Sequence, residues 1–462
     1  MNTSKIKPES VEVLRALLKL NGALIVYDPL YKMADCSFFI ARDIRTLLKN
    51  SSSREVCINL SGRSLEVLSF DFILEIDTTK RKYKSFFCEQ FLTIKNPDRS
   101  VRWFLPVHAK HPDFLALYNG AGIKASLFNF VVRMAFIVGL KKWVCREKFF
   151  LYSKEEKYFQ KQFDNKELAV FTGTVGENRK AVVAICENGK ATHFVKIPVS
   201  ETAKQLIETE HAHLVAINEY GFKRMSVPVS EMKAIGLQLT SIRPKDSRVS
   251  ITLNDLHLEV LKNLYANTFQ LKMLSNLDSY QEIENHLKKI KLFIENKNEN
   301  ILDRKTERLA YNIKGLLKTF DKKQLIPVAY AHGDFTPWNM FVTEKRIHLY
   351  DWELAMPEQL FLYDAFHFVF QSSILILHQP FEQIKAKIIA LENREVVIDL
   401  LERYKLDYWA CYRWYLISNC SYYLDLYLSQ ETLHVQAHWL VDCWIEATND
   451  AIITLQRKVE MV

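Results

Sequence analysis

The residues His332-Gly-Asp-Phe-Thr-Pro-Trp-Asn339, followed twelve positions after Asn339 by Asp351-Trp-Glu353, are the most informative part of this 462-residue chain. The preceding residues 328–332 are apolar enough to run as a buried strand, and Gly333 frees the backbone to turn. Residues 347–350 have the pattern of a second strand that ends at Asp351. The sequence therefore predicts a strand, a loop and a strand, with three polar side chains converging at the loop.

The residue types at this loop match the needs of phosphoryl transfer. That chemistry needs a carboxylate near the attacking hydroxyl, and oxygen ligands that hold Mg²⁺ against nucleotide phosphates. Asp334 fits the first role, and Asn339 and Asp351 fit the second. Either fragment alone is more typical of a turn or a strand end. Both fragments at this spacing arise by chance in roughly 10⁻⁵ of chains of this size, which favours the catalytic interpretation.

The stretch resembles the catalytic and metal loops of the aminoglycoside phosphotransferase and choline kinase family, with the likeness extending over about residues 165–450. The resemblance implies a protein-kinase-like fold, ATP and Mg²⁺ as cofactors, Asp334 as catalytic base, and Asn339 with Asp351 as metal ligands. It also implies that His332 braces the loop, so we group it with the catalytic residues. Asp364 matches a family aspartate that caps a helix shortly after the metal loop.

In that family a smaller β-rich lobe lies upstream, with a phosphate-covering loop and a strand lysine. Here two β-rich runs flank a loop that contains Gly173 and Gly176, which predicts a hairpin whose tip covers the phosphates; a plain hairpin turn is the alternative. Residues 187–189 predict a further turn, and residues 192–198 a strand ended by proline. The resemblance places Lys196, in this strand, on the phosphates; an exposed lysine on one sheet face is the alternative.

A helix is predicted over residues 200–217, with Ser200 and Glu201 as capping residues. Glu210 matches the family glutamate that holds the lysine better than Glu208 does, although most helical glutamates are simply solvated. Residues 235–244 predict a strand running into the connector between lobes, where the resemblance implies that main-chain groups bind adenine.

The larger lobe is predicted to be mainly helical, with apolar residues at spacings of three and four. The predicted helices cover 256–274, 279–295, 303–320, 384–393 and 395–408, and an aromatic-rich region follows. Aromatic residues at helical spacing are usually core, while choline kinases cage a cation with aromatic faces. Asp407, Asp425 and Asp442 on these helices could bind a cationic acceptor or face solvent.

Residues 1–160 match nothing in the family core. Strands are predicted over 55–60, 70–76, 86–94 and 101–105, with a helix over 10–20 and a turn at 96–98. We expect a small α+β domain followed by a linking helix over 125–144. That apolar helix is too short and too interrupted by Arg133 to span a membrane. It could contact a membrane interface with its lysines on the headgroups, or pack between domains, and packing is favoured.

Composition agrees with an ordinary soluble α+β protein of three parts: an extension (1–160), a kinase-like β-rich lobe (161–245) and a helical lobe (246–462). The net charge of +8 suits an anionic nucleotide, and no basic block or zinc pattern indicates nucleic acid. Eight scattered cysteines without a C-x-x-C pair predict reduced thiols. We find no signal peptide in the sequence and expect a cytoplasmic protein.

These observations favour an ATP- and Mg²⁺-dependent phosphotransferase that acts on a hydroxyl of a small molecule such as an amino alcohol, a sugar or a cell-surface precursor. Two alternatives stay open: a nucleotide-binding pseudokinase, and a kinase acting on a protein or a membrane lipid. The sequence leaves the acceptor, the choice of ATP or GTP, and the oligomeric state undecided.

Overall fold

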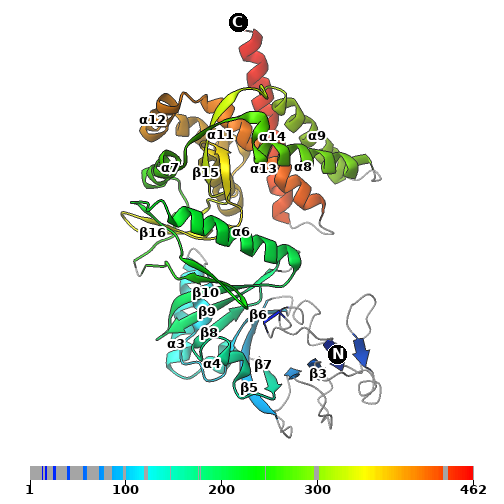
Figure 1. The fold of residues 1–462 in the computed structure, drawn as a ribbon, viewed down its shortest axis with the longest axis vertical. Helices are drawn as coiled ribbons and strands as arrows, with labels where there is room; N and C mark the ends of the chain where they lie inside the picture. The colour runs from blue at the N-terminus through cyan, green and yellow to red at the C-terminus, as the bar shows by residue number, and fades with distance from the viewer. Residues whose placement is uncertain are drawn as a thin grey trace. The chain divides into compact units, whose positions relative to one another are not determined.

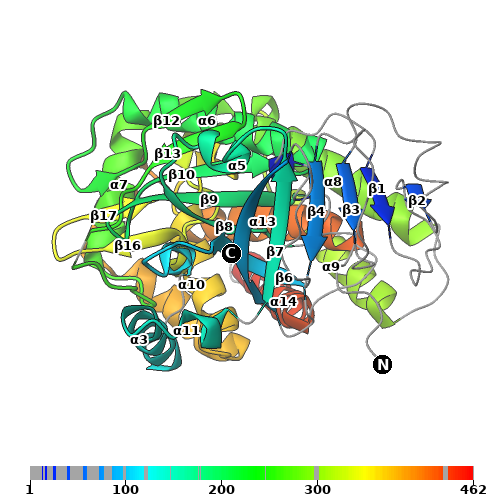
Figure 2. The same ribbon diagram turned by 90° about the horizontal axis from the view of Figure 1, so that it is seen from below.

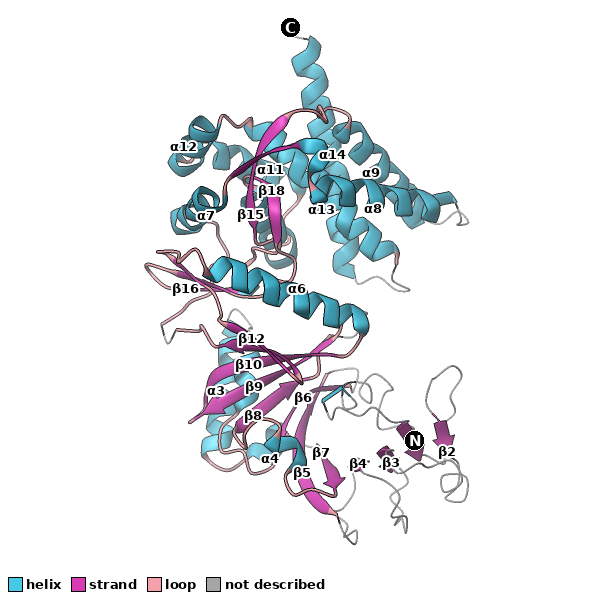
Figure 3. Cartoon of the chain, in the orientation of Figure 1, coloured by secondary structure: helices cyan, strands magenta, loops and turns pink. Residues whose placement is uncertain are grey.

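The computed structural model places most of the chain from residue 86 onward and short segments before it. The described residues are 13, 16–17, 24–27, 39–41, 56–59, 72–76, 86–96, 100–118, 123–145, 147–174, 176, 178–244, 246–295, 301–429 and 435–460. Two compact units are present: unit 1 comprises 1–215 with 228–241, and unit 2 comprises 216–227 with 242–462. Unit 1 is mainly strand and unit 2 mainly helix (Figure 3), so the predicted α+β class is confirmed.

Unit 1 is built on one sheet of twelve described strands. Its order is β12 (Ser230–Lys233), β13 (Gly236–Thr240), β10 (Lys190–Pro198), β9 (Lys180–Glu187), β8 (Glu167–Phe171), β6 (Val101–Pro106), β5 (Phe87–Lys95), β7 (Glu147–Ser153), β4 (Phe72–Ile76), β3 (Val56–Asn59), β1 (Leu24–Tyr27) and β2 (Phe39–Ala41). Each pair of adjacent strands in the sheet from β12 to β4 is antiparallel. The strands β4, β3, β1 and β2 at the other end of the sheet are parallel to one another (Figures 1 and 2).

The turn between β9 and β10 shows how local sequence sets this register. Asn188 and Gly189 both have positive φ, at 51° and 72°, and Glu187 pairs with Lys190 across the turn. Two central residues at positive φ define the two-residue hairpin turn that Asn-Gly favours. The turn predicted at 187–189 is therefore confirmed, and it aligns β10 so that Lys196 lies opposite Val182.

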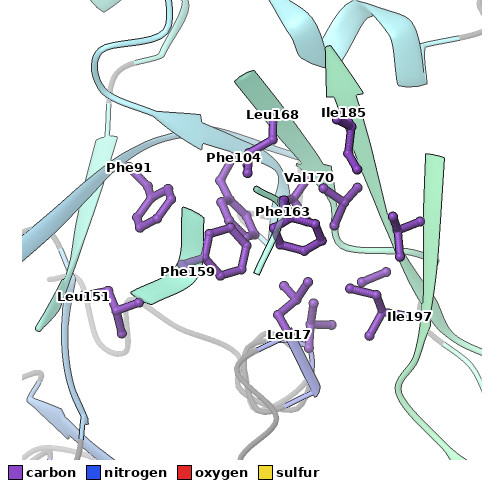
Figure 4. Close-up of a cluster of buried hydrophobic side chains, with 14 of the residues drawn as sticks. Leu17, Phe91, Phe104, Leu151, Phe159, Phe163, Leu168, Val170, Ile185 and Ile197 are labelled. Carbon is purple, nitrogen blue, oxygen red and sulfur yellow. The ribbon is translucent and has the colours of Figure 1, made fainter. Parts of the chain in front are cut away.

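The core of unit 1 joins strands from both sides of residue 160. Side chains of β5, β6 and β7 meet those of β8, β9 and β10 in one buried cluster (Figure 4). Phe91 stacks on Phe149 with ring centroids 4.8 Å apart, and Val170 of β8 belongs to the same cluster. β6 also pairs directly with β8, Phe104 opposite Val170. The predicted boundary at residue 160 stays a prediction; the sheet and its core are continuous there.

Helical segments of unit 1 connect or cover these strands. They are η1 (Asp113–Leu117), α3 (Ile123–Ile137), α4 (Lys141–Val144), α5 (Tyr158–Lys161) and α6 (Glu201–Asn218). The single helix predicted over 125–144 is wrong in one respect, because the chain breaks at Gly139, whose φ is +77°, into α3 and α4. The predicted start of the next helix is confirmed: the Ser200 hydroxyl accepts a hydrogen bond from the Ala203 N–H at 3.0 Å.

Unit 2 combines two small sheets with a set of helices. The sheets are β11 (Met225–Ser226), β17 (Ile347–Leu349) and β16 (Met340–Val342), and β14 (Gln270–Met273), β15 (Leu325–Ala331) and β18 (Met356–Leu360). The helical segments are α7 (Asp255–Thr268), η2 (Leu274–Asn276), α8 (Asp278–Glu295), α9 (Ile301–Leu317), η3 (Pro337–Asn339), α10 (Tyr363–Gln371), the π-turn η4 (Ser372–Ile376), α11 (Phe381–Glu392), α12 (Glu395–Tyr404), α13 (Tyr408–Leu428) and α14 (Val435–Glu460).

One predicted helix of unit 2 is too long. The pattern over 256–274 predicts a helix, but α7 ends at Thr268 and the next residues form β14, which pairs with β15. Backbone pairing with the strand that leads to His332 overrides the helical pattern. The helix predicted over 10–20 and the turn at 96–98 fall largely outside the described residues. The six cysteines whose side chains are described are free thiols, and no described helix has the length and hydropathy of a membrane span.

Candidate active site

A short hairpin in unit 2 carries both candidate metal ligands. β16 and β17 are antiparallel, with Met340 opposite Leu349, so the residues flanking this pair lie at the same end of the hairpin. The Tyr350 N–H donates to the Asn339 carbonyl at 3.0 Å and extends the ladder by one step. Asn339 before β16 and Asp351 after β17 therefore emerge side by side in the fold, although twelve positions separate them in sequence.

The backbone after β15 turns sharply at Gly333. Its φ is +81°, and a Cβ atom there would lie 1.9 Å from the carbonyl oxygen of Leu354. Both the left-handed conformation and the close backbone approach exclude any other residue without rearrangement. The glycine thus lets β15 end against the segment that follows Asp351, and it turns Asp334 out of the strand direction.

Asp364 holds this turn from α10. Its Oδ2 accepts from the His332 N–H at 2.7 Å, and its Oδ1 accepts from the Gly333 N–H at 3.0 Å. The residue is fully buried, and burial raises the pKa of Asp364 to about 6 although both N–H groups lower it. The expected helix-capping role is wrong, because Leu362 is the N-cap of α10 and Asp364 turns to the loop instead.

His332 connects the turn to the hairpin. Its Nδ1 accepts from the Asp334 N–H at 3.3 Å, so its Nε2 carries the proton and donates to the Tyr350 carbonyl at 3.0 Å. Burial lowers the pKa of His332 to about 4, which keeps the ring neutral near pH 7. A neutral ring with both nitrogens occupied is suited to holding Asp334 and Tyr350 in position.

The Asp334 carboxylate is fixed at both oxygens, while its side chain keeps 23% of its surface exposed. Asn339 Nδ2 donates to Oδ2 at 2.7 Å and also to the Asp334 carbonyl at 3.1 Å. Nε2 of His367, a fully buried residue of α10, lies 3.2 Å from Oδ1. The carboxylate is thus aimed by two side chains and stays open on one side.

His367 is the residue of this site that the sequence did not reveal. It lies 33 positions after Asp334, among the phenylalanines of α10, where it resembles a core residue. One signal could have found it. Residues three apart on a helix share a face, so a helix that turns Asp364 toward the loop also turns His367 toward it.

Asp351 stands in a constrained backbone position. Its φ is +68°, a conformation that costs free energy for a residue with a side chain. Tyr350 before it is held at its N–H by Asn339 and at its carbonyl by His332, and its hydroxyl donates to the Trp338 carbonyl. These contacts fix the direction in which Asp351 leaves the hairpin.

The donor set of the hairpin fits a hard divalent cation. Asn339 turns its amide nitrogen to Asp334, which leaves the carbonyl oxygen Oδ1 as its ligand atom, and Asp351 contributes a carboxylate. Oxygen ligands of this kind, few in number and supplemented by substrate phosphates, are how proteins hold Mg²⁺. Asn339 and Asp351 are therefore the residues that would hold the metal, and the Asp334 carboxylate lies partly exposed next to Asn339.

In unit 1, Lys196 and Glu210 form an ion pair. The Lys196 ammonium donates to both Glu210 carboxylate oxygens, at 2.8 and 2.7 Å, and the Glu210 side chain is fully buried. Glu208, the other candidate on α6, is exposed. The lysine side chain of β10 therefore points from the sheet to α6, and the alternative of a solvent-facing lysine does not describe it. Their proposed role on nucleotide phosphates stays a prediction.

The glycine loop of unit 1 lies in the hairpin between β8 and β9. Gly173 has a φ of +78°, and a Cβ atom there would lie 2.1 Å from the Lys180 carbonyl oxygen. The Arg179 guanidinium donates from Nε to the Thr172 carbonyl at 3.0 Å and closes the loop at its base. Gly176 at the tip is exposed and has open space around it. The predicted hairpin with a glycine tip is confirmed, and its phosphate-covering role is untested.

The aromatic residues of α13 are largely core, as the helical spacing favoured. Tyr408, Tyr412, Trp414 and Tyr415 are buried, and Trp444 of α14 is fully buried. The three carboxylates considered for a cationic acceptor all have protein partners. Asp407 caps α13, Asp425 contacts His286 and Lys289, and Asp442 pairs with Lys305.

No family model and no curated protein matches the chain, whereas solved structures do. The match to an ADP-bound aminoglycoside phosphotransferase spans 63% of this chain and 97% of the phosphotransferase chain, at 12% sequence identity and a TM-score of 0.41. The match to LicA in complex with AMP spans 64% of this chain and 98% of the LicA chain, at 12% sequence identity and a TM-score of 0.41. The match to a choline/ethanolamine kinase family protein from Mesorhizobium loti spans 61% of this chain and 87% of that protein's chain, at 11% sequence identity and a TM-score of 0.37.

The matched structures are aminoglycoside phosphotransferases and choline kinases, the family that the loop motif resembles, and the N-terminal region lies outside the match. At TM-scores of 0.41 and below, this likeness carries no argument about substrate or activity.

Proposed function

We propose that the chain is an ATP- and Mg²⁺-dependent phosphotransferase that transfers the γ-phosphoryl group to a hydroxyl of a small molecule. The observation that carries this proposal is the geometry of Asp334, whose carboxylate is fixed by Asn339 and His367 and lies partly exposed beside the hairpin end that presents Asp351. A base, held beside two oxygen ligands for a metal, is the arrangement that this reaction requires.

In the proposed reaction Asp334 orients the acceptor hydroxyl and accepts its proton. The acceptor oxygen forms a bond to the γ-phosphorus as the bond between that phosphorus and the β–γ bridging oxygen breaks, so ADP leaves. Mg²⁺, when bound, neutralises the charge on the phosphate oxygens. Asn339 serves twice, since its amide nitrogen holds Asp334 while its carbonyl oxygen is free to face the metal.

Lys196 would bind the nucleotide phosphates, and Glu210 would hold it in place. Glu210 is fully buried, so its charge depends on the ammonium group of Lys196. Breaking a buried pair by removing one partner costs about 3–5 kcal/mol, because the other charge is left uncompensated. The loop with Gly173 and Gly176 would cover the phosphates with backbone N–H groups, for which its exposed glycine tip gives the required access.

The test compares nucleotide binding with turnover in the full chain. Calorimetric titration of Mg·ATP should give binding that depends on Mg²⁺ and is weakened in Asp351→Asn. Asp334→Ala should retain binding but lose turnover by roughly 10²–10⁴-fold in an acceptor screen of amino alcohols and sugars. Asp321→Asn is the matched control, because Asp321 is exposed and its turn contact survives the substitution. Absence of Mg·ATP binding to wild type would refute the proposal and favour a chain without catalytic function.

A second candidate acceptor is the headgroup of a membrane lipid. The observation that favours it is the exposed apolar surface of α3, which a purely soluble acceptor does not require. Phosphate transfer from radiolabelled ATP into a lipid extract, compared with transfer into the water-soluble acceptors, separates the two. Labelled lipid with no labelled soluble product would favour the lipid acceptor.

A further inference from the structure

An apolar face of α3 is exposed in unit 1. Its six side chains share one side of the helix, within roughly a third of its circumference at 3.6 residues per turn. They are Leu127, Phe130, Val131, Met134, Ile137 and Val138, the last directly after the helix. Phe130 is 63% exposed and Ile137 76% exposed. Single exposed apolar residues are ordinary, but a continuous stripe marks an interaction surface.

The opposite face of α3 is already packed. Val132 and Phe136 are buried in a core cluster with Trp103, Leu105 and Phe114 of the sheet side of unit 1. Helix α3 therefore has two apolar faces. One packs against unit 1, and the other, the exposed stripe, is not covered by that packing.

A short helix, α4, follows α3 and is anchored to unit 1. The Lys141 ammonium donates to the carbonyl oxygens of Val107 and Ala109, at 2.7 and 3.0 Å, which anchors α4 to unit 1. Beyond this anchor, Trp143 is 76% exposed and Lys142 is exposed. An exposed indole next to an exposed lysine is a composition typical of a lipid-headgroup interface.

The sequence that forms α3 and α4 carries basic residues and no acidic ones. Between Asp113, which is buried, and Glu147 the sequence contains no acidic residue and five basic ones. They are Lys124, Arg133, Lys141, Lys142 and Arg146. Arg133 is exposed and flanks the apolar stripe on α3. An exposed apolar stripe with the exposed cations Arg133 on α3 and Lys142 on α4 complements an anionic bilayer, which supplies apolar chains beneath negative headgroups.

We propose that the surface formed by α3 and α4 docks this protein onto anionic phospholipid bilayers. The helix would lie in the plane of the membrane interface with its stripe among the upper acyl chains, while Arg133 and Lys142 contact headgroup phosphates. Each such cation contributes about fivefold in partitioning, corresponding to about 1 kcal/mol near an anionic surface. The apolar stripe supplies the part of the binding that does not depend on salt.

Co-sedimentation of the full chain with vesicles tests this surface. One set contains phosphatidylcholine alone and the other equal molar amounts of phosphatidylcholine and phosphatidylglycerol. We expect wild type to partition at least about tenfold more strongly into the anionic vesicles, and added salt to reduce the difference. The double variant Phe130→Asp with Ile137→Asp should lose binding to both sets. The double variant Arg133→Ala with Lys142→Ala should lose the preference for anionic vesicles.

Matched controls lie on α9. Tyr311→Asp replaces an aromatic residue that is also 76% exposed, and Lys314→Ala removes an exposed cation. Neither should change partitioning, and equal thermal unfolding shows that every variant is folded. The proposal is overturned if wild type binds neither vesicle set, or if the α3 variants bind as wild type does. It is also overturned if sedimentation velocity shows that the α3 substitutions only convert a self-associated chain into monomers.

Discussion

Asp334 is positioned by residues that come from three parts of unit 2. The amide of Asn339 reaches it from the hairpin, the ring of His367 from α10, and the ring of His332 receives its backbone N–H. Each partner is itself fixed, His332 through the Tyr350 carbonyl and α10 through the two bonds of Asp364. Such supporting contacts hold the carboxylate in one orientation, which the catalytic role proposed for Asp334 requires.

We predict that His367 is a positioning residue for Asp334. In His367→Ala the Asp334 carboxylate loses one of its two side-chain contacts, so kcat should fall by roughly 10–100-fold, as for other orienting partners, while the KM for Mg·ATP stays close to wild type. His367→Gln, which retains a donor, should recover part of the loss. Steady-state kinetics measures both constants.

His378→Ala provides the control, because His378 is an exposed histidine of the same unit with no contact to Asp334 among the described residues. Equal kcat values for His367→Ala and wild type would contradict the positioning role. A loss of kcat in His378→Ala of the same size would show that the effect is not specific.

For single residues, the sequence predicted the candidate site residues that lie within one short segment, and it missed His367, which lies outside that segment. Asp334, Asn339 and Asp351 are recognisable because their spacing is set by one loop and one hairpin. His367 could be found only by first placing Asp364 against the loop, because its position three residues later on α10 then turns it to the same side. Asp364 has a different partner from the one that its sequence position predicts, because a carboxylate in a first helical turn ordinarily interacts with its own helix.

Helix α7 begins at a capping box that contains a buried histidine. The Asn254 side chain accepts from the His257 N–H, and the His257 ring returns to the Asn254 backbone N–H. The ring is fully buried beside Phe335 and Phe368, and burial lowers the pKa of His257 to about 4. The start of α7 is therefore stabilised only while the buried His257 ring is neutral.

We predict that His257 makes unit 2 less stable in mild acid. Its folded pKa lies below the unfolded value of 6.5, so its contribution is complete above about pH 6.5 and is lost as pH falls toward about 4. At about pH 5 the loss should be about 2 kcal/mol relative to His257→Gln, which keeps a capping-box side chain without titrating. Urea unfolding of both proteins at pH values above and below 6.5 measures the difference; parallel pH profiles would contradict it.

Elements whose signals are local were predicted well, and those fixed by distant pairing were not. The Asn188-Gly189 turn and the Ser200 cap involve neighbouring residues, and both are confirmed. The segment 270–273 has a helical pattern but forms β14, because β15 offers it a strand edge. A propensity is a weak preference that such tertiary pairing readily overrides.

For the whole molecule, the order of the strands in the sheet of unit 1 is the feature that local sequence patterns determine least. The predicted boundary at residue 160 stays a prediction; β6 pairs with β8, and the aromatic residues of β5, β6 and β7 share a core with β8, β9 and β10. Alternation within a strand predicts that it has one buried face, but does not say which other strand lies beside it. Strand existence was therefore predictable, and the sheet order was not.

We predict that a fragment of residues 161–462 does not form a stable β-rich unit. It lacks Phe91, Phe104 and Phe149, so Leu168 and Val170 would lose their packing partners and β8 would present an open edge. The full chain and the fragment should be compared by size-exclusion chromatography and thermal unfolding followed by circular dichroism. A monomeric fragment that unfolds at the same temperature as the full chain would show that residues 1–160 are a separate domain.

The pairing of β6 with β8 also bears on the order in which the strands of unit 1 can pair while the chain is synthesised. β5, β6 and β7 leave the ribosome before β8, and domains generally form as their residues emerge, from the N-terminus onward. The strands of the extension can therefore assemble first and offer the edge of β6 as a template for β8. Nascent chains released before residue 171 would carry that edge unpaired, and an unpaired strand edge is a site at which chains aggregate.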